Sequence, residues 1–208
     1  MNRHDGATLG RAALRSGRYL LAGDIEFPEA RLGDTIETAD GTTFVVYRET
    51  VRRSAEPDPS DEGVVLVFKM RVTNRAARDP FRAALFDPIA NVATPFFAGL
   101  PGFRRKLWLA GEQPGEFLEL YEWASEADAE RFVDALRALI APVDHAGTIE
   151  FDVVAHDSVE AYVDAGAATW REAPPEANRP PRRTTVLAGV LGVGLALAVG
   201  YALRRRLR

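Results

Sequence analysis

The stretch PGFRRKLWLAGEQPGEFLELYEW, residues 101–123, predicts a β-hairpin that is buried on both faces. Turn-forming residues at 111–115 separate two arms, at 103–110 and 116–123. Side chains alternate along a strand, so the second arm presents apolar groups in both directions. One face carries Phe117, Tyr121 and Trp123, and the other carries Leu118 and Leu120. Helices of the same chain can cover one face, and we expect a second subunit to cover the other.

The segments on either side of this hairpin complete a repeating order of strands and helices. Residues 63–73 form an apolar strand, and Asp79-Pro80 opens a helix that we expect to reach residue 96, with a kink or a division into two short helices at Pro88. A second helix begins after Ser125, and residues 148–155 form another strand. The order strand, helix, strand, strand, helix, strand predicts an α+β, ferredoxin-like βαββαβ fold.

Two segments before this unit extend it. Residues 1–23 place arginines on one helical face, which favours a short helix on the body or, alternatively, a basic helix on a membrane surface. Residues 24–62 contain a β-hairpin around Asp40-Gly41 and then an acidic, proline-containing linker. After the last strand, Ser158 is expected to cap a helix that continues through Trp170.

The end of the sequence predicts a membrane anchor. Residues 173–183 are a proline-rich linker, and residues 184–203 carry no charge. Twenty helical residues span about 30 Å, the hydrocarbon thickness of a bilayer, so we expect a transmembrane helix followed by the basic tail 204–208. Arginines flank both ends of this segment. We expect a single-pass C-terminal anchor with the soluble domain in the cytoplasm.

Composition excludes several classes of function. All 30 acidic residues precede residue 179, whereas seven of the 26 basic residues lie at or after it, so the body is acidic and unsuited to nucleic acid. The absence of cysteine excludes disulfides, thiolate metal sites and cysteine nucleophiles. The three histidines show no zinc spacing, and no hydrolase or phosphate-binding motif occurs outside residues 184–203. We therefore predict no metal and no cofactor.

The hairpin and the helix SEADAERFVDALRALI after it (residues 125–140) resemble the YdhR-type monooxygenases of the dimeric α/β-barrel superfamily. The shared pattern runs from Pro101-Gly102-Phe103 through Lys106 and Trp108 to Tyr121 and into that helix. The resemblance implies a dimeric α/β barrel over residues 63–172, a homodimer, and an apolar pocket between sheet and helices. It also implies cofactor-independent oxygenation of a small hydrophobic, aromatic substrate. Other families of the superfamily degrade haem or have no known activity.

The site residues follow from this resemblance. Such a reaction needs a base, hydrogen-bond donors and a dry cavity. Lys106 would stabilise an anion, Tyr121 would donate a hydrogen bond, and His156 would be the base. The predicted pocket walls are Phe68, Phe97, Trp108 and Trp123. The alternative is that the aromatic residues are ordinary core, that Lys106 and His156 end their strands in solvent, or that Lys106 lies in a subunit interface.

Three functions stay open on the sequence alone. The first is a membrane-anchored monooxygenase, and the second is a membrane-anchored dimeric binding or scaffold module without turnover. The third is haem binding or degradation, with His156 or His145 as ligand. The first two differ in whether Lys106, Tyr121 and His156 converge on one enclosed site.

Overall fold

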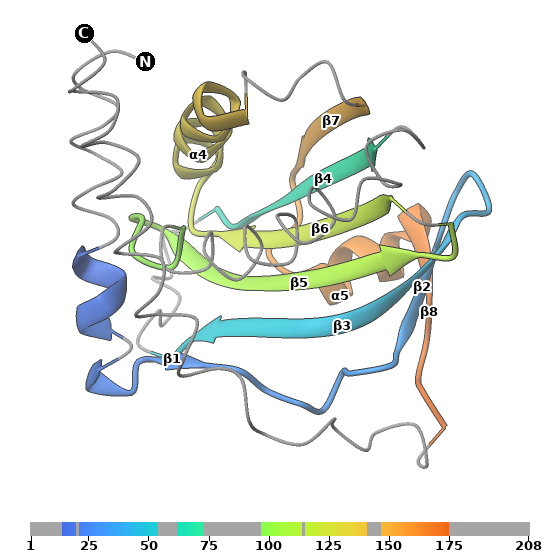
Figure 1. Ribbon diagram of the computed structural model, residues 1–208, viewed down its shortest axis with the longest axis horizontal. Coiled ribbons are helices and arrows are strands. Elements are labelled where there is room, and N and C mark those ends of the chain that lie inside the picture. The colour runs from blue at the N-terminus through green and yellow to red at the C-terminus, as the bar shows by residue number, and fades with distance from the viewer. Residues whose placement is uncertain are drawn as a thin grey trace, which may run out of the picture.

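The computed structural model describes residues 14–19, 21–53, 62–72, 97–113, 115–140 and 147–174 (Figure 1). The helix predicted at residues 79–96 and the transmembrane helix predicted at residues 184–203 lie outside these ranges, as does most of the proline-rich linker. Among the helices within them, none has the length and apolar character needed to cross a membrane.

Four strands form the sheet predicted for residues 63–156. They are β4 (Val64–Val72), β5 (Phe103–Gly111), β6 (Glu116–Trp123) and β7 (Gly147–Val154). Their order across the sheet is β7-β4-β6-β5, every neighbouring pair is antiparallel, and helix α4 (Glu126–Ile140) connects β6 to β7. This is the strand order of a ferredoxin-like unit, and it confirms the predicted α+β class.

The N-terminal hairpin continues this sheet. Strand β3 (Thr43–Arg52) pairs with β5, and β2 (Thr35–Thr38) pairs with β3 around a turn in which Gly41 has φ 78°. Strand β8 (Ala168–Arg171) pairs with the outer edge of β2, and the short β1 (Ile25–Glu26) pairs with β3. The hairpin predicted at Asp40-Gly41 is therefore confirmed, and it belongs to the main sheet.

The sheet is buried on both faces, as its alternation predicts. The first face packs under α4 and holds Tyr121 and Trp123 with Phe132 of the helix. The second face holds Leu118 and Leu120. Figure 1 shows α4 on one side of the strands and the short helix α5 (Val159–Tyr162) on the other.

The cover of the second face comes from the chain itself. Val159 of α5, Ile36 of β2 and Trp170 of β8 all pack against the cluster that contains Leu118 and Leu120. A second subunit was expected here because the ferredoxin-like unit alone leaves this face bare. Strands β2 and β8 and helix α5 cover this face instead. The homodimer therefore remains a prediction, and the second face gives it no support.

The segment after β7 corrects one sequence prediction. Ser158 does cap a helix, because its hydroxyl accepts from the Ala161 amide at 3.2 Å, but α5 has only four residues. A π-helical turn η2 (Val163–Ala167) follows, in which Gly166 takes φ 83° and ends the helical path. Trp170, expected on the helix, lies in β8 instead, where its indole N–H donates to Asp34 at 3.0 Å. Pairing with β2 outweighs local helical preference in this segment.

Candidate active site

A fully buried lysine lies on the first face of the sheet. Lys106 in β5 is opposite Tyr121 of β6, and its side chain is only 1 % exposed. Strand alternation puts Lys106 and Trp108 on the face under α4 and leaves Leu107 on the other. Lysine is almost never fully buried unless a partner compensates its charge, so its surroundings define the site.

Lys106, Glu119 and Tyr121 form a closed triangle of hydrogen bonds. The Lys106 Nζ donates to Glu119 Oε2 and to the Tyr121 hydroxyl, each at 2.7 Å. The Tyr121 hydroxyl donates to the same Glu119 oxygen. Glu119 and Tyr121 are two residues apart on β6 and so share a face. One carboxylate therefore bridges an amine and a phenol.

Aromatic rings enclose the amine. The Lys106 Nζ lies 2.9 Å from the ring centroid of Trp108, 4.5 Å from that of Phe97 and 4.4 Å from that of Tyr121. Such contacts stabilise an ammonium group and exclude water from it. The Glu119 side chain is 14 % exposed, so the triangle is open to solvent on its carboxylate side.

Burial changes the protonation of the two bridged groups in opposite directions. Desolvation lowers the pKa of Lys106 to about 7; Glu119 opposes this shift and Arg48 adds to it. Desolvation, reinforced by Glu119, raises the pKa of Tyr121 well above its usual value. Slightly above neutral pH, the site therefore combines an unprotonated amine with a protonated phenol.

Three residues around the site have a buried polar atom with no hydrogen-bond partner among the described residues. They are Trp108 and Trp123, each through its indole Nε1, and Thr50 through its hydroxyl; Thr50 lies opposite Lys106 across the β3–β5 pairing. Buried polar groups are nearly always paired, so an unpaired donor marks a place where a ligand atom or a water would gain a hydrogen bond.

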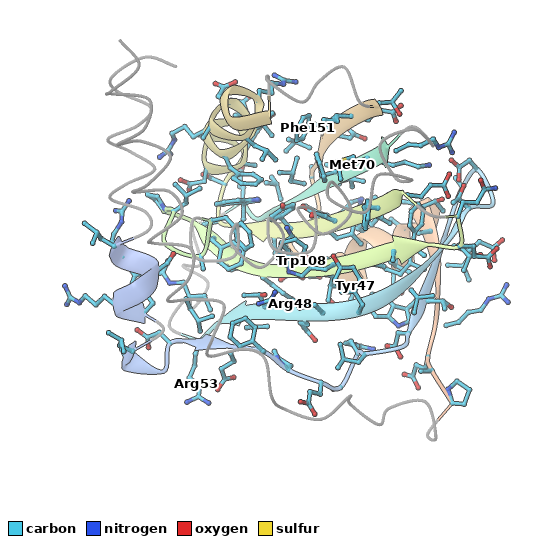
Figure 2. The ribbon with its side chains drawn as sticks, viewed as in Figure 1. Tyr47, Arg48, Arg53, Met70, Trp108 and Phe151 are labelled. Carbon is cyan, nitrogen blue, oxygen red and sulfur yellow. The ribbon has the colours of Figure 1, made fainter. Side chains whose placement is uncertain are left out.

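A β-bulge shapes the edge of the site. The register between β3 and β5 shifts between Val46 and Arg48, so Tyr47 is the additional residue. Arg48 then lies opposite Trp108, with its guanidinium 5.8 Å from the Trp108 centroid and 5.1 Å from that of Phe27. Figure 2 labels Tyr47, Arg48 and Trp108 together at the centre of the sheet.

The structure brings most of the predicted site residues together. The four predicted pocket residues pack in one cluster with Tyr121: Phe68, Phe97, Trp108 and Trp123. The Lys106 amine lies against three rings of this cluster, those of Phe97, Trp108 and Tyr121. His156 lies apart, because its ring is 6.0 Å from Tyr162, which packs against the second face. The expected convergence holds for Lys106 and Tyr121 and does not include His156.

Glu119 is the site residue that sequence reasoning missed. Alternation places it on the face of Tyr121, and it is an acid between two leucines in a buried strand. Its contact with Lys106 depends on the β5–β6 register, which contains a shift between Phe103 and Arg105. The residue types in the turn do not determine the register of the β5–β6 pairing, so the sequence alone did not reveal this contact.

A second buried charge cluster, on the opposite face, holds α5 in place. Arg105 pairs with Glu49 at 2.7 Å, Glu122 at 3.2 Å and Glu160 of α5 at 2.8 Å. Glu122 also accepts the Val159 amide at 2.9 Å. Burial raises the pKa of Glu122, although Arg105 opposes the shift. This cluster joins the sheet to the C-terminal cover. Within the described ranges, no group of acidic or histidine side chains could hold a metal ion.

Comparisons with known proteins give limited likenesses. No protein-family model matches the chain, and no curated protein matches it. SnoaB, a cofactor-independent oxygenase from Streptomyces nogalater, is 23% identical over 47% of this chain and 97% of its own, with a TM-score of 0.34. LmHde, a heme-degrading enzyme from Listeria monocytogenes, is 14% identical over 67% of this chain and 91% of its own, with a TM-score of 0.42. An anthrone oxidase-like protein is 15% identical over 54% and 52%, with a TM-score of 0.36.

Proposed function

We propose that this protein is a cofactor-independent monooxygenase that oxidises a small aromatic C–H acid, with Lys106 as the base. The observation that carries the proposal is the buried Lys106 amine, enclosed by aromatic rings and 2.7 Å from both a carboxylate and a phenol. Burial in such surroundings makes a lysine amine a base near neutral pH.

The proposed reaction requires only oxygen and the substrate. The neutral Lys106 amine removes a proton from an activated methylene group and becomes an ammonium ion beside the new carbanion. The carbanion passes one electron to oxygen, and the two radicals combine to a peroxide anion. The Lys106 ammonium returns its proton to this anion, and the hydroperoxide then loses water to leave the carbonyl. One methylene and one oxygen molecule thus give one carbonyl and one water. The proton that Lys106 takes supplies the positive charge that stabilises the anion.

The other site residues have roles that fit this step. Tyr121 stays protonated and donates a hydrogen bond to the substrate, while Glu119 fixes the Lys106 and Tyr121 side chains through its hydrogen bonds to both. The rings of Phe97 and Trp108 exclude water from the carbanion. His156, which the resemblance implied as a base, lies on the second-face side and has no part in the proposal.

We propose further that residues 184–203 anchor the protein in a membrane with the soluble domain in the cytoplasm. The uncharged segment of twenty residues between arginine-containing flanks supports this. Anchoring would place the site beside a substrate that partitions into the bilayer.

Oxygen uptake by the full-length protein in detergent tests the enzymatic proposal. We choose anthrone as the probe because it is an aromatic C–H acid, and we expect protein-dependent oxygen consumption that Lys106→Met abolishes. The matched control is Lys69→Met, since Lys69 is the other lysine of the chain and pairs with Asp40 on the surface. No uptake above the spontaneous rate, or equal uptake by Lys106→Met, would reject the proposal.

A binding module without turnover is the second candidate. The observation in its favour is that the Lys106 amine is already fully engaged by Glu119, Tyr121 and the Trp108 ring. Saturable quenching of tryptophan fluorescence by anthrone, without oxygen uptake, would support it.

A further inference from the structure

We infer that Lys106 is also a nucleophile, which forms a Schiff base with a small apolar aldehyde or ketone. This activity goes beyond the proposed oxygenation, although it uses the same amine. It rests on the arrangement of three groups around Lys106: a phenol, a carboxylate and a wall of aromatic rings.

The groups needed for imine formation are within reach of one another. When the Lys106 nitrogen attacks a carbonyl carbon, a C–N bond forms and the carbonyl π pair moves to oxygen. The Tyr121 hydroxyl, 2.7 Å from the amine, can donate a proton to that oxygen. The Glu119 carboxylate, also 2.7 Å away, can take the proton that the attacking nitrogen loses. The protonated Glu119 then gives its proton to the carbinolamine hydroxyl, which leaves as water, and the remaining N–H proton returns to Tyr121, so each imine releases one water.

The enclosure limits which carbonyl compounds can react. Lys106 is 1 % exposed, and the rings of Trp108 and Phe97 lie against its amine. Exclusion of water favours the imine, because water is the product of its formation and the reagent of its hydrolysis. Trp108, whose ring lies against the Lys106 amine, has an unpaired Nε1 that offers a hydrogen bond to a second oxygen on the substrate. A short, apolar carbonyl compound, such as a diketone, fits these conditions.

The chain contains its own control for the reaction. Lys69 and Lys106 are its two lysines. Lys69 is 27% exposed and lies 2.5 Å from Asp40 in the β2–β3 turn, away from the aromatic rings around Lys106. If accessibility alone decided reactivity, Lys69 would react first. If the Lys106 site activates its amine, the buried lysine would react first, since burial keeps a large share of it unprotonated near neutral pH.

Acetylacetone is a suitable probe, because it condenses with a reactive amine to a stable enaminone that absorbs in the near ultraviolet. Full-length protein in detergent is treated at about pH 8 under nitrogen, and labelled positions are identified by peptide mass. We expect one equivalent of label on Lys106 before Lys69 or the N-terminal amine reacts. Preferential labelling of Lys69, or near-ultraviolet absorbance that persists in Lys106→Met, would overturn the inference.

A second variant separates chemistry from folding. Tyr121→Phe retains the ring and the Lys106 amine but removes the proton donor. We expect it to label at least about 10²-fold more slowly, the usual contribution of a general acid, and to reach the same final stoichiometry. An unchanged rate would remove the phenol from the mechanism. Because labelling needs no oxygen, enaminone formation without anthrone oxidation rejects only the oxygenase proposal, and oxidation without labelling rejects only this one.

Discussion

At the scale of single residues, the decisive feature is a lysine that the fold buries beside one carboxylate. Burial removes the ammonium from water at a cost that the Glu119 oxygen and the Trp108 ring only partly offset, so the pKa of Lys106 falls to about 7. The same burial that weakens the folded state at acid pH gives the amine its basicity and its nucleophilicity. Stability and reactivity at Lys106 are therefore linked.

This linkage predicts a pH-dependent stability. The unfolded chain keeps the Lys106 proton up to its ordinary pKa of 10.5, whereas the folded state loses it near 7. Between these values the unfolded state binds more protons, so the free energy of unfolding rises with pH. We expect this rise, by up to about 1 kcal/mol per pH unit, to be absent in Lys106→Met. Urea unfolding of both proteins between about pH 7.5 and 9.5 measures it. Parallel curves would contradict the depressed pKa.

Glu119→Gln tests the carboxylate by a different route. Since Glu119 raises the pKa of Lys106 against the effect of burial, its neutral replacement would lower that pKa further. We expect the pH profile of acetylacetone labelling at Lys106 to move to lower pH, with a lower maximal rate because the proton acceptor is lost. Below about pH 7, where Lys106 carries its charge, we also expect a loss of about 3 kcal/mol in the free energy of unfolding, because the buried ammonium loses its partner. Glu130→Gln, on the exposed side of α4, is the control. An unchanged pH profile would show that Glu119 does not control the amine.

At the scale of secondary-structure elements, the sheet could be predicted far better than its C-terminal cover. The hairpin at 103–123 and the strands around it were predictable, because strand alternation and turn residues are local signals. Residues 163–171 have a helical apolar pattern but form η2 and β8, because Gly166 ends the helix and β2 offers an open edge. An edge contributed from more than a hundred residues away leaves no local signal.

Pairing between strands that are far apart in the sequence also limited how much of the candidate site could be predicted. Alternation placed Tyr121 and Trp123 on one face of their strand, the resemblance implied Phe68 and Trp108 as further pocket residues, and all four pack in one cluster. Glu119 and the separation of His156 depend on which strands pair and in what register. Pairing partners are a tertiary property, so a single sequence shows them poorly.

Arg105 is expected to be the residue that holds α5 to the sheet. Replacing it by Met leaves Glu49, Glu122 and Glu160 near one another without their shared cation. We expect a loss of about 3–5 kcal/mol in the free energy of unfolding and faster proteolysis of the segment after β7. The control is Arg171→Met, whose exposed pair with Glu37 should contribute at most about 1 kcal/mol. Equal proteolysis of the two variants would show that Arg105 does not hold α5.

At the scale of the whole molecule, β2, α5 and β8 cover a sheet face that the ferredoxin-like unit alone leaves open. Ile36 comes from the N-terminal hairpin and Trp170 from β8, and both belong to or pack against the cluster that contains Leu118 and Leu120. A homodimer, if it forms, would have to use another surface or displace these segments. The second face is part of the folded core of one chain.

Truncation tests this cover. A chain that ends after residue 156 lacks α5 and β8, whereas one that ends after residue 174 keeps them. We expect the shorter chain to bind a hydrophobic dye and to self-associate with rising concentration, because it exposes the second face. Native mass spectrometry of the two chains makes the comparison. A monomer mass and no dye binding for both chains would show that the sheet needs no cover on this side.

The pairing of β2 with β8 also sets an order for biosynthesis. Thr35 meets Arg171, and the Ala173 amide donates to Asp34, so the sheet is completed only by its final described segment. Strand β2 pairs early with β3, but a ribosome that has translated β2 must add more than a hundred further residues before its second partner, β8, is available. Until then the nascent chain carries bare apolar surface, a substrate for chaperones. Closure of the domain and emergence of the uncharged segment 184–203 would then follow within moments of each other.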